Sequence, residues 1–361
     1  MHSRTALSVS FLLLALAGLG CTSSHDAMPT DYQAILRHPG VVPTPNLDSC
    51  FTGSGALVEL GAVSNNDQHD HGALLTFGIS PSGLLAAAGA DGTLKFWTMD
   101  ATLVGTANPT VLTYGPEIAA APITDLAFTD TLAIAGDVRG LVEQLGPTGE
   151  QAVLGGTTPG VSIASVAFDR VAHRLAHAQH RGTSGTAVTP LVVNTLDGTM
   201  HANITDTMLS ITDLAFTVEG VLVVGGNDGT RAMLELRDGA DPTRVIATPT
   251  LSGSTVVEVA TAHLGPTIVA LTDHALFVIE GTRARQIVAS EVAFRSVDVT
   301  PSGDFALTVD ASGSVVVWST SSGAAVAHRS IGSALGVRID SGGRRAVVGG
   351  SDAMLHVLGC R

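Results

Sequence analysis

The chain has 361 residues, of which 45% are hydrophobic and 14% are charged, and 41 are glycine. This composition excludes disorder of the whole chain, because so apolar a chain can bury enough surface to offset the entropy lost on folding. The formal net charge of -14 argues against nucleic acid as a partner and against direct binding to anionic membrane surfaces. The single lysine, Lys95, provides no Gly-Lys pair for a phosphate-binding loop.

The first residues have the features of an export signal. Arg4 precedes an apolar run at 11–20, which is too short to cross a bilayer of about 30 Å as a helix. Cys21 follows directly, and this arrangement resembles a bacterial lipoprotein signal, in which the cysteine is lipidated after cleavage. Thr22 after the cysteine resembles the sorting class for the outer membrane. Two alternatives remain, a plain cleaved signal and an apolar first strand that buries Cys21.

The sequence predicts three segments. Residues 1–20 form the signal peptide, residues 21–49 hold the lipid-attachment cysteine and a linker, and residues 50–361 form one folded domain. The linker is inferred because residues 22–49 contain four prolines and show neither a helical nor a strand period.

The folded region is built from repeats. The block ITDLAF occurs at 123–128 and again at 211–216, and weaker copies indicate seven repeats with a period of about 43 residues. Each copy consists of short apolar stretches separated by Gly-rich turns, without a long stretch of helical period. A period of this length with strand patterning is typical of a β-propeller.

Two copies show the repeating unit most clearly. The first runs LLTFGI, SPSG, LLAAAG, ADG, TLKFW from Leu74 to Trp97, and the sixth copy repeats the pattern as far as Trp318. The Pro- and Gly-containing segments predict hairpin turns between three strands, and a fourth, outer strand is expected after each tryptophan position.

These two copies resemble WD repeats. Trp97 and Trp318 match the tryptophan of that motif, while Thr98 and Ser319 replace its aspartate. The resemblance implies an all-β, seven-bladed propeller of four-stranded antiparallel blades. Because the Gly-His pair that opens a typical repeat is absent, the hydrogen-bonded tetrad of the family is expected to be missing, with stability resting on apolar packing.

Six copies carry an aspartate at an equivalent turn. The first interpretation is that each accepts N–H bonds within its own turn, and the alternative is an acidic rim that binds a cation or a partner. The six residues are Asp91, Asp137, Asp228, Asp273, Asp310 and Asp352.

Two groups of histidines are candidate metal ligands. They are His69 with His71 beside Asp70, and His173, His177 and His180 in the third copy. Neither group completes a zinc set, so the prediction is no metal and no cofactor. A long insert, Gln179 to Thr189, is the candidate binding loop.

Familiar enzyme motifs are absent from the sequence. The favoured hypothesis is a non-catalytic WD-repeat-like scaffold, a monomeric ring anchored by lipid in the bacterial cell envelope, that binds an unidentified envelope protein. The alternative is an exported propeller hydrolase, lactonase or quinone-dependent dehydrogenase with a site in the channel.

The two ends of the folded region are expected to meet. The seventh copy supplies only three strands, and residues 56–60 (ALVEL) read as a strand without a blade. If this strand completes the last blade by antiparallel pairing, it brings Cys50 next to Cys360. The sequence therefore predicts a ring closed by the N-terminal strand and by a disulfide, which an oxidising compartment permits.

Overall fold

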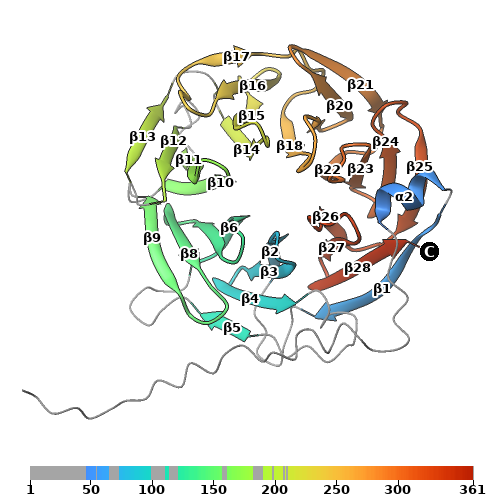
Figure 1. Ribbon diagram of the computed structural model, residues 1–361, viewed down its shortest axis with the longest axis horizontal. Helices are drawn as coiled ribbons and strands as arrows, with labels where there is room; N and C mark the ends of the chain where they lie inside the picture. Colours follow the sequence, from blue (N-terminus) through green and yellow to red (C-terminus); the bar gives the residue numbers. More distant parts are fainter. Residues whose placement is uncertain are drawn as a thin grey trace, which may run out of the picture. The chain divides into compact units, whose positions relative to one another are not determined.

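The computed structural model shows a ring of seven antiparallel sheets, each of four strands (Figure 1). It describes residues 46–53, 55–64, 73–98, 110–113, 121–156, 161–181, 190–196, 199–205, 208 and 210–360. The ring lies within one compact unit, Thr44–Arg361. The predicted seven-bladed propeller is confirmed. No helix in these ranges is long and apolar enough to cross a membrane.

The strands follow the chain around the ring, and the first strand of each blade lies at the centre (Figure 1). Blade 1 contains β2 (Leu74–Ile79), β3 (Leu84–Gly89), β4 (Thr93–Thr98) and β5 (Thr110–Thr113). Blade 2 contains β6 (Ile123–Phe128), β7 (Ala133–Asp137), β8 (Leu141–Leu145) and β9 (Gln151–Gly156). Blade 3 contains β10 (Val161–Asp169), β11 (Arg174–Arg181), β12 (Leu191–Thr195) and β13 (Met200–Ile204).

The remaining blades have the same order. Blade 4 contains β14 (Ser210–Phe216), β15 (Val221–Asn227), β16 (Ala232–Asp238) and β17 (Val245–Ala247). Blade 5 contains β18 (Val256–Thr261), β19 (Ile268–Thr272), β20 (Ala275–Glu280) and β21 (Arg283–Ala289). Blade 6 contains β22 (Phe294–Val299), β23 (Phe305–Asp310), β24 (Ser314–Ser319) and β25 (Ala325–Ser330). Blade 7 contains β26 (Ala334–Ile339), β27 (Ala346–Gly350), β28 (Met354–Cys360) and β1 (Leu57–Ser64).

The predicted hairpin turns form, and their glycines and serines stabilise them as expected. Gly83 of SPSG and Gly303 of TPSG have φ values of 84° and 85°, a backbone region open to glycine at little cost. The serine that opens SPSG adds a side-chain bond, because Ser80 Oγ accepts the N–H of Leu84 at 3.0 Å. Local turn chemistry therefore sets where each first strand folds back into the second.

The hydrophobic core is divided among the blade interfaces. Seven clusters of buried apolar side chains lie in the ring, one between each pair of neighbouring blades. Glycines make room where a large side chain faces the next blade. A Cβ built on Gly349 of β27 would lie 2.4 Å from the ring of Phe77 on β2, so blades 7 and 1 pack only because this position is glycine.

The ring closes through the N-terminal strand, as predicted. β1 pairs antiparallel with β28, with Leu57 opposite Cys360. A disulfide joins Cys50 to Cys360, whose Cα atoms are 6.1 Å apart. The pairing and the disulfide hold together two segments separated by 310 positions in sequence.

A short helix, α2 (Leu47–Thr52), covers this closure and was not predicted. Residues 47–49 belong to this helix, although the sequence pattern placed them in the linker. Asn46 begins the helix by accepting the N–H of Asp48 at 2.8 Å, and Leu47 and Phe51 are buried. The helix is too short to show a clear apolar period, which is why the sequence pattern missed it.

Candidate functional site at the central channel

Six consecutive blades, from blade 2 to blade 7, are joined by side chains on their first strands. In each case a side-chain oxygen accepts a backbone N–H from the first strand of the next blade. The pairs are Asp125 with Val166 (2.8 Å), Ser165 with Leu214 (3.2 Å), Asp213 with Val259 (2.7 Å), Glu258 with Val297 (2.6 Å) and Ser296 with Val337 (3.1 Å). These five bonds are called the inner clasps.

The inner clasps share a structural cause. Each accepting residue directly follows a register shift at which the first strand carries one extra residue. Such a bulge changes the direction of the next side chain, and here it brings that side chain to the neighbouring blade. One sequence feature, a polar residue after the bulge, is thereby repeated around more than half of the ring.

The series of inner clasps stops on either side of blade 1. The equivalent residue of blade 7 is Gly336, which has no side chain to offer, and that of blade 1 is Thr76. Within the part of the chain that the structure describes, the Thr76 side chain has no hydrogen-bond partner. Blades 7 and 1 pack instead through Phe77, which lies against Gly336 and Gly349.

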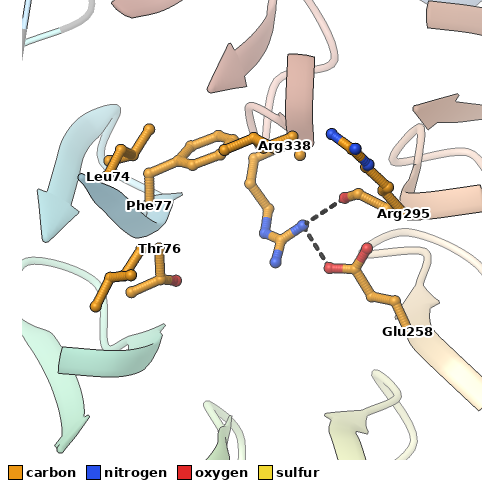
Figure 2. Close-up of a pocket in the computed structure, with 10 residues that line it drawn as sticks. Leu74, Thr76, Phe77, Glu258, Arg295 and Arg338 are labelled. Atoms are coloured by element: carbon orange, nitrogen blue, oxygen red, sulfur yellow. Dashed lines mark hydrogen bonds and ion pairs between the residues drawn. The ribbon is translucent and has the colours of Figure 1, made fainter. Parts of the chain in front are cut away.

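One arginine projects into this ring of carboxylates. Figure 2 shows the Arg338 guanidinium pointing toward Glu258, with Nη1 2.6 Å from Oε1. The same nitrogen lies 3.4 Å from Ser296 Oγ, and the guanidinium carbon is 5.9 Å from the centre of the Phe77 ring. Arg338 therefore connects blade 7 to blades 5, 6 and 1.

The carboxylates of the channel are held close to one another. Burial raises the pKa of Asp125, Asp213 and Asp298, that of Asp298 to about 6. For Asp213, the charges of Glu258 and Asp125 add to the effect of burial. Burial alone would lower the pKa of Arg338, but the carboxylates, Glu258 first, raise it above its ordinary value. These carboxylates and Arg338 thus form one electrostatically coupled unit.

The channel walls enclose two hollows. One, of about 190 Å³, is lined by the four channel carboxylates and by the ends of the first strands, including Phe128, Phe168 and Phe216. The other, of about 140 Å³, lies beside Arg338 and is lined by Leu75, Arg295 and Leu335 (Figure 2). Among the described residues there is no group of three or more His, Cys, Asp or Glu arranged to hold a metal ion.

The six turn aspartates lie where the second strand turns into the third, and two of them, Asp137 and Asp310, are the last residues of the second strand. Five of them accept an N–H from their own turn, and Asp273 accepts the N–H of Ser254 at 3.2 Å instead. The five bonds are Asp91 to Thr93 (3.0 Å), Asp137 to Arg139 (2.8 Å), Asp228 to Thr230 (2.9 Å), Asp310 to Ser312 (2.8 Å) and Asp352 to Met354 (3.0 Å). In these five turns the aspartate side chain therefore stabilises the turn in which it lies.

The two motif tryptophans differ in one bond. Trp318 Nε1 donates to Thr308 Oγ1 at 2.8 Å. One side-chain hydrogen bond between neighbouring strands is therefore present, although the hydrogen-bonded tetrad was expected to be missing. Trp97 is 3% exposed, and its Nε1 has no partner among the described residues. The reason lies in the opposite strand, where the position equivalent to Thr308 is Ala87.

The structure separates the histidines of the third copy. His177 is 1% exposed and lies in the sheet, where burial lowers its pKa to about 4. His173 lies in the preceding turn with a φ of 52°, an uncommon value for a residue other than glycine. Asp70 and its two neighbouring histidines, and residues 182–189 of the predicted binding loop, lie outside the described residues, as does Cys21.

The channel carboxylates and Arg338 were missed by motif searching, because they come from separate blades. A signal was present, since both copies of ITDLAF place an aspartate inside an otherwise apolar strand. A charge there is costly unless it is paired, which points to a structural or functional role.

The comparison with protein families supports the repeat assignment. The profile of the WD domain, G-beta repeat, matches residues 64–98, which contain the first three strands of blade 1. No curated protein matches the chain. Together with the ring of seven blades, the match identifies the fold as a WD-repeat-like β-propeller.

Proposed function

We propose that this protein is a non-catalytic scaffold that binds another protein in the bacterial cell envelope and is anchored there by lipid on Cys21. The observation that carries the proposal is the WD-repeat-like ring itself. Its channel carboxylates accept backbone N–H bonds from the first strand of the next blade, so they serve the ring's own assembly. A ring of this kind presents turns on two rims as fixed binding surfaces.

The proposed location rests on two features of the chain. The first is the apolar run followed by Cys21. The second is the disulfide between Cys50 and Cys360, since disulfides persist mainly in oxidising compartments. Outer membrane is preferred over inner membrane because Thr22, rather than an aspartate, follows the cysteine.

Crosslinking in the native cell tests the scaffold. Cells are treated with a short amine- and carboxyl-reactive crosslinker, the protein is purified under denaturing conditions, and captured proteins are identified by mass spectrometry. The proposal predicts one or a few envelope proteins enriched over an unrelated exported protein of similar abundance. Recovery of the protein without any enriched partner, at several crosslinker lengths, would contradict it.

A single substitution tests the anchor. In Cys21→Ser the proposal predicts release from the membrane fraction and loss of labelling by a radioactive fatty acid. The parent chain should remain membrane-bound after a high-salt wash. Identical partition of the two proteins would exclude lipid attachment at this cysteine.

An exported enzyme with a site in the channel is the second candidate. The observation in its favour is the convergence of Asp125, Asp213, Glu258 and Asp298 around Arg338, because coupled carboxylates with raised pKa values also occur in active sites. Metal analysis of the purified protein and a screen of lactone, ester and alcohol substrates distinguish the two. A stoichiometric metal, or turnover abolished by Asp213→Asn, would favour the enzyme.

A further inference from the structure

One arc of a rim carries exposed aliphatic side chains. The turns between the first and second strands of blades 3, 4 and 5 each carry an exposed aliphatic side chain. Val171 is 73% exposed, Val218 is 45% exposed and Leu264 is 79% exposed. A single exposed aliphatic residue needs no explanation, but three in corresponding turns of consecutive blades define a surface. This surface is called the apolar arc.

Residues close in sequence to the apolar arc line the larger hollow. Phe168 and Phe216 are the partly exposed residues near the ends of β10 and β14, and both line this hollow of about 190 Å³. They come from the same two hairpins as Val171 and Val218. Aromatic rings at the mouth and aliphatic side chains beside it can together cover an apolar side chain of a partner.

Two hydrogen-bond donors without acceptors lie at the same mouth. Arg170 and His263 both line the hollow, and neither has a hydrogen bond or ion pair with any residue that the structure describes. Loss of solvent lowers the pKa of Arg170, and only Asp130 opposes this effect. Loss of solvent and the charge of Arg170 also lower the pKa of His263, to about 4. A neutral imidazole beside a guanidinium offers N–H groups to an anion.

We propose that this mouth docks an acidic segment of a partner protein, with a carboxylate between Arg170 and His263 and a neighbouring apolar side chain on Phe168, Phe216 and the apolar arc. The inference rests on the proposed scaffold function and adds the surface and the chemistry of the partner.

The channel explains why the carboxylate stays at the mouth. Asp125 and Asp213 lie three residues before the strand ends at Phe128 and Phe216, which places them about 10 Å deeper. At that depth four carboxyl groups line the hollow beside the single guanidinium of Arg338, and a further carboxylate is not favoured there. Arg170 is half-buried and lines the hollow near these strand ends, where an acidic segment at the mouth can reach it.

Peptide selection tests the proposal without knowledge of the natural partner. Random peptides of about twelve residues, displayed on phage, are selected on the purified, immobilised full chain. The enriched sequences are then synthesised, and their affinities are measured by fluorescence anisotropy. The expected result is a shared Asp or Glu next to an apolar residue, with binding that weakens as salt is raised.

Matched variants locate the site. Arg170→Gln should weaken binding about tenfold or more, since a charge-assisted hydrogen bond is lost, and Arg170→Lys should weaken it less. Arg283→Gln, an exposed change on β21, should leave affinity unchanged. On the unmutated chain, bound peptide should protect amides near Val171 and Leu264 from hydrogen exchange, a readout that does not depend on any variant folding.

Three results would overturn the proposal. They are enrichment of basic peptides, which would place a cation in the channel, absence of any enriched peptide, and acidic peptides whose affinity is the same for Arg170→Gln. The last result rejects this surface while leaving the scaffold function standing, because crosslinking in the cell tests that function separately.

Discussion

Arg338 Nη1 on β26 lies 2.6 Å from Glu258 Oε1 on β18, so one ion pair connects blade 7 with blade 5 past the blade between them. The Arg338 side chain is 31% exposed and that of Glu258 is 12% exposed. Glu258 also accepts the N–H of Val297 on the intervening blade at 2.6 Å. This pair therefore connects the inner strands of three consecutive blades.

Replacement of this arginine should destabilise the ring in a pH-dependent way. For Arg338→Met we expect a loss of about 1–2 kcal/mol in the free energy of unfolding at pH 7.5, discounted because the pair is partly exposed. The loss should be smaller near pH 4, which is below the pKa of about 6 of Asp298, because this carboxyl group is then protonated and no longer repels its neighbours. Urea unfolding at the two pH values measures both, with Arg283→Met as the exposed control. An equal loss at both would contradict the coupling.

The disulfide should contribute much of the stability of the closed ring. Crosslinking segments 310 positions apart stabilises by about 6 kcal/mol on the chain-entropy model, which is an upper figure. The paired variant Cys50→Ser with Cys360→Ser should unfold at a clearly lower urea concentration than the parent. A reductant should shift the parent to the same midpoint and leave the variant unchanged. A parent insensitive to reductant in the unfolding transition would argue against the bond.

Acidification should destabilise the protein through His177. Its pKa is lowered by burial to about 4 in the folded chain, against an ordinary value near 6.5 when unfolded. Between these values the unfolded chain binds the extra proton, so stability is lost as pH falls from about 6.5 to 4. His177→Leu should reduce that loss by about 2–3 kcal/mol, measured as the difference between pH 7.5 and pH 4. The exposed His328→Gln should have the wild-type profile.

The unpaired tryptophan of blade 1 offers a gain in stability. Ala87→Ser places a hydroxyl on the strand beside Trp97, two residues from the direct partner Leu85, as Thr308 lies two residues from Ala306, the direct partner of Trp318. We expect a gain of up to about 1 kcal/mol, and Thr308→Ala should lose about 1–2 kcal/mol. Thermal unfolding monitored by tryptophan fluorescence measures both. A loss in Ala87→Ser would show that the added oxygen does not reach the indole N–H.

The propeller was predictable from sequence because its information is local and repeated. SPSG and TPSG specify the turns, and ITDLAF recurs at a fixed spacing. Closure was predictable because one strand and two cysteines were left without partners. The channel site was not predictable, because Glu258 and Arg338 meet only after three blades have formed. Their spacing along the chain matches no sequence motif. The Thr308 bond was missed because it depends on cross-strand register rather than on spacing along the chain.

The most direct test of the scaffold account is photo-crosslinking from defined positions in living cells. A photoreactive amino acid replaces Val171 in the apolar arc or, as a control, the exposed Val326 on β25. The account predicts a discrete adduct of higher mass from position 171, weakened by Arg170→Gln and absent from position 326. No adduct from position 171, or the same set of adducts from both positions, would contradict it.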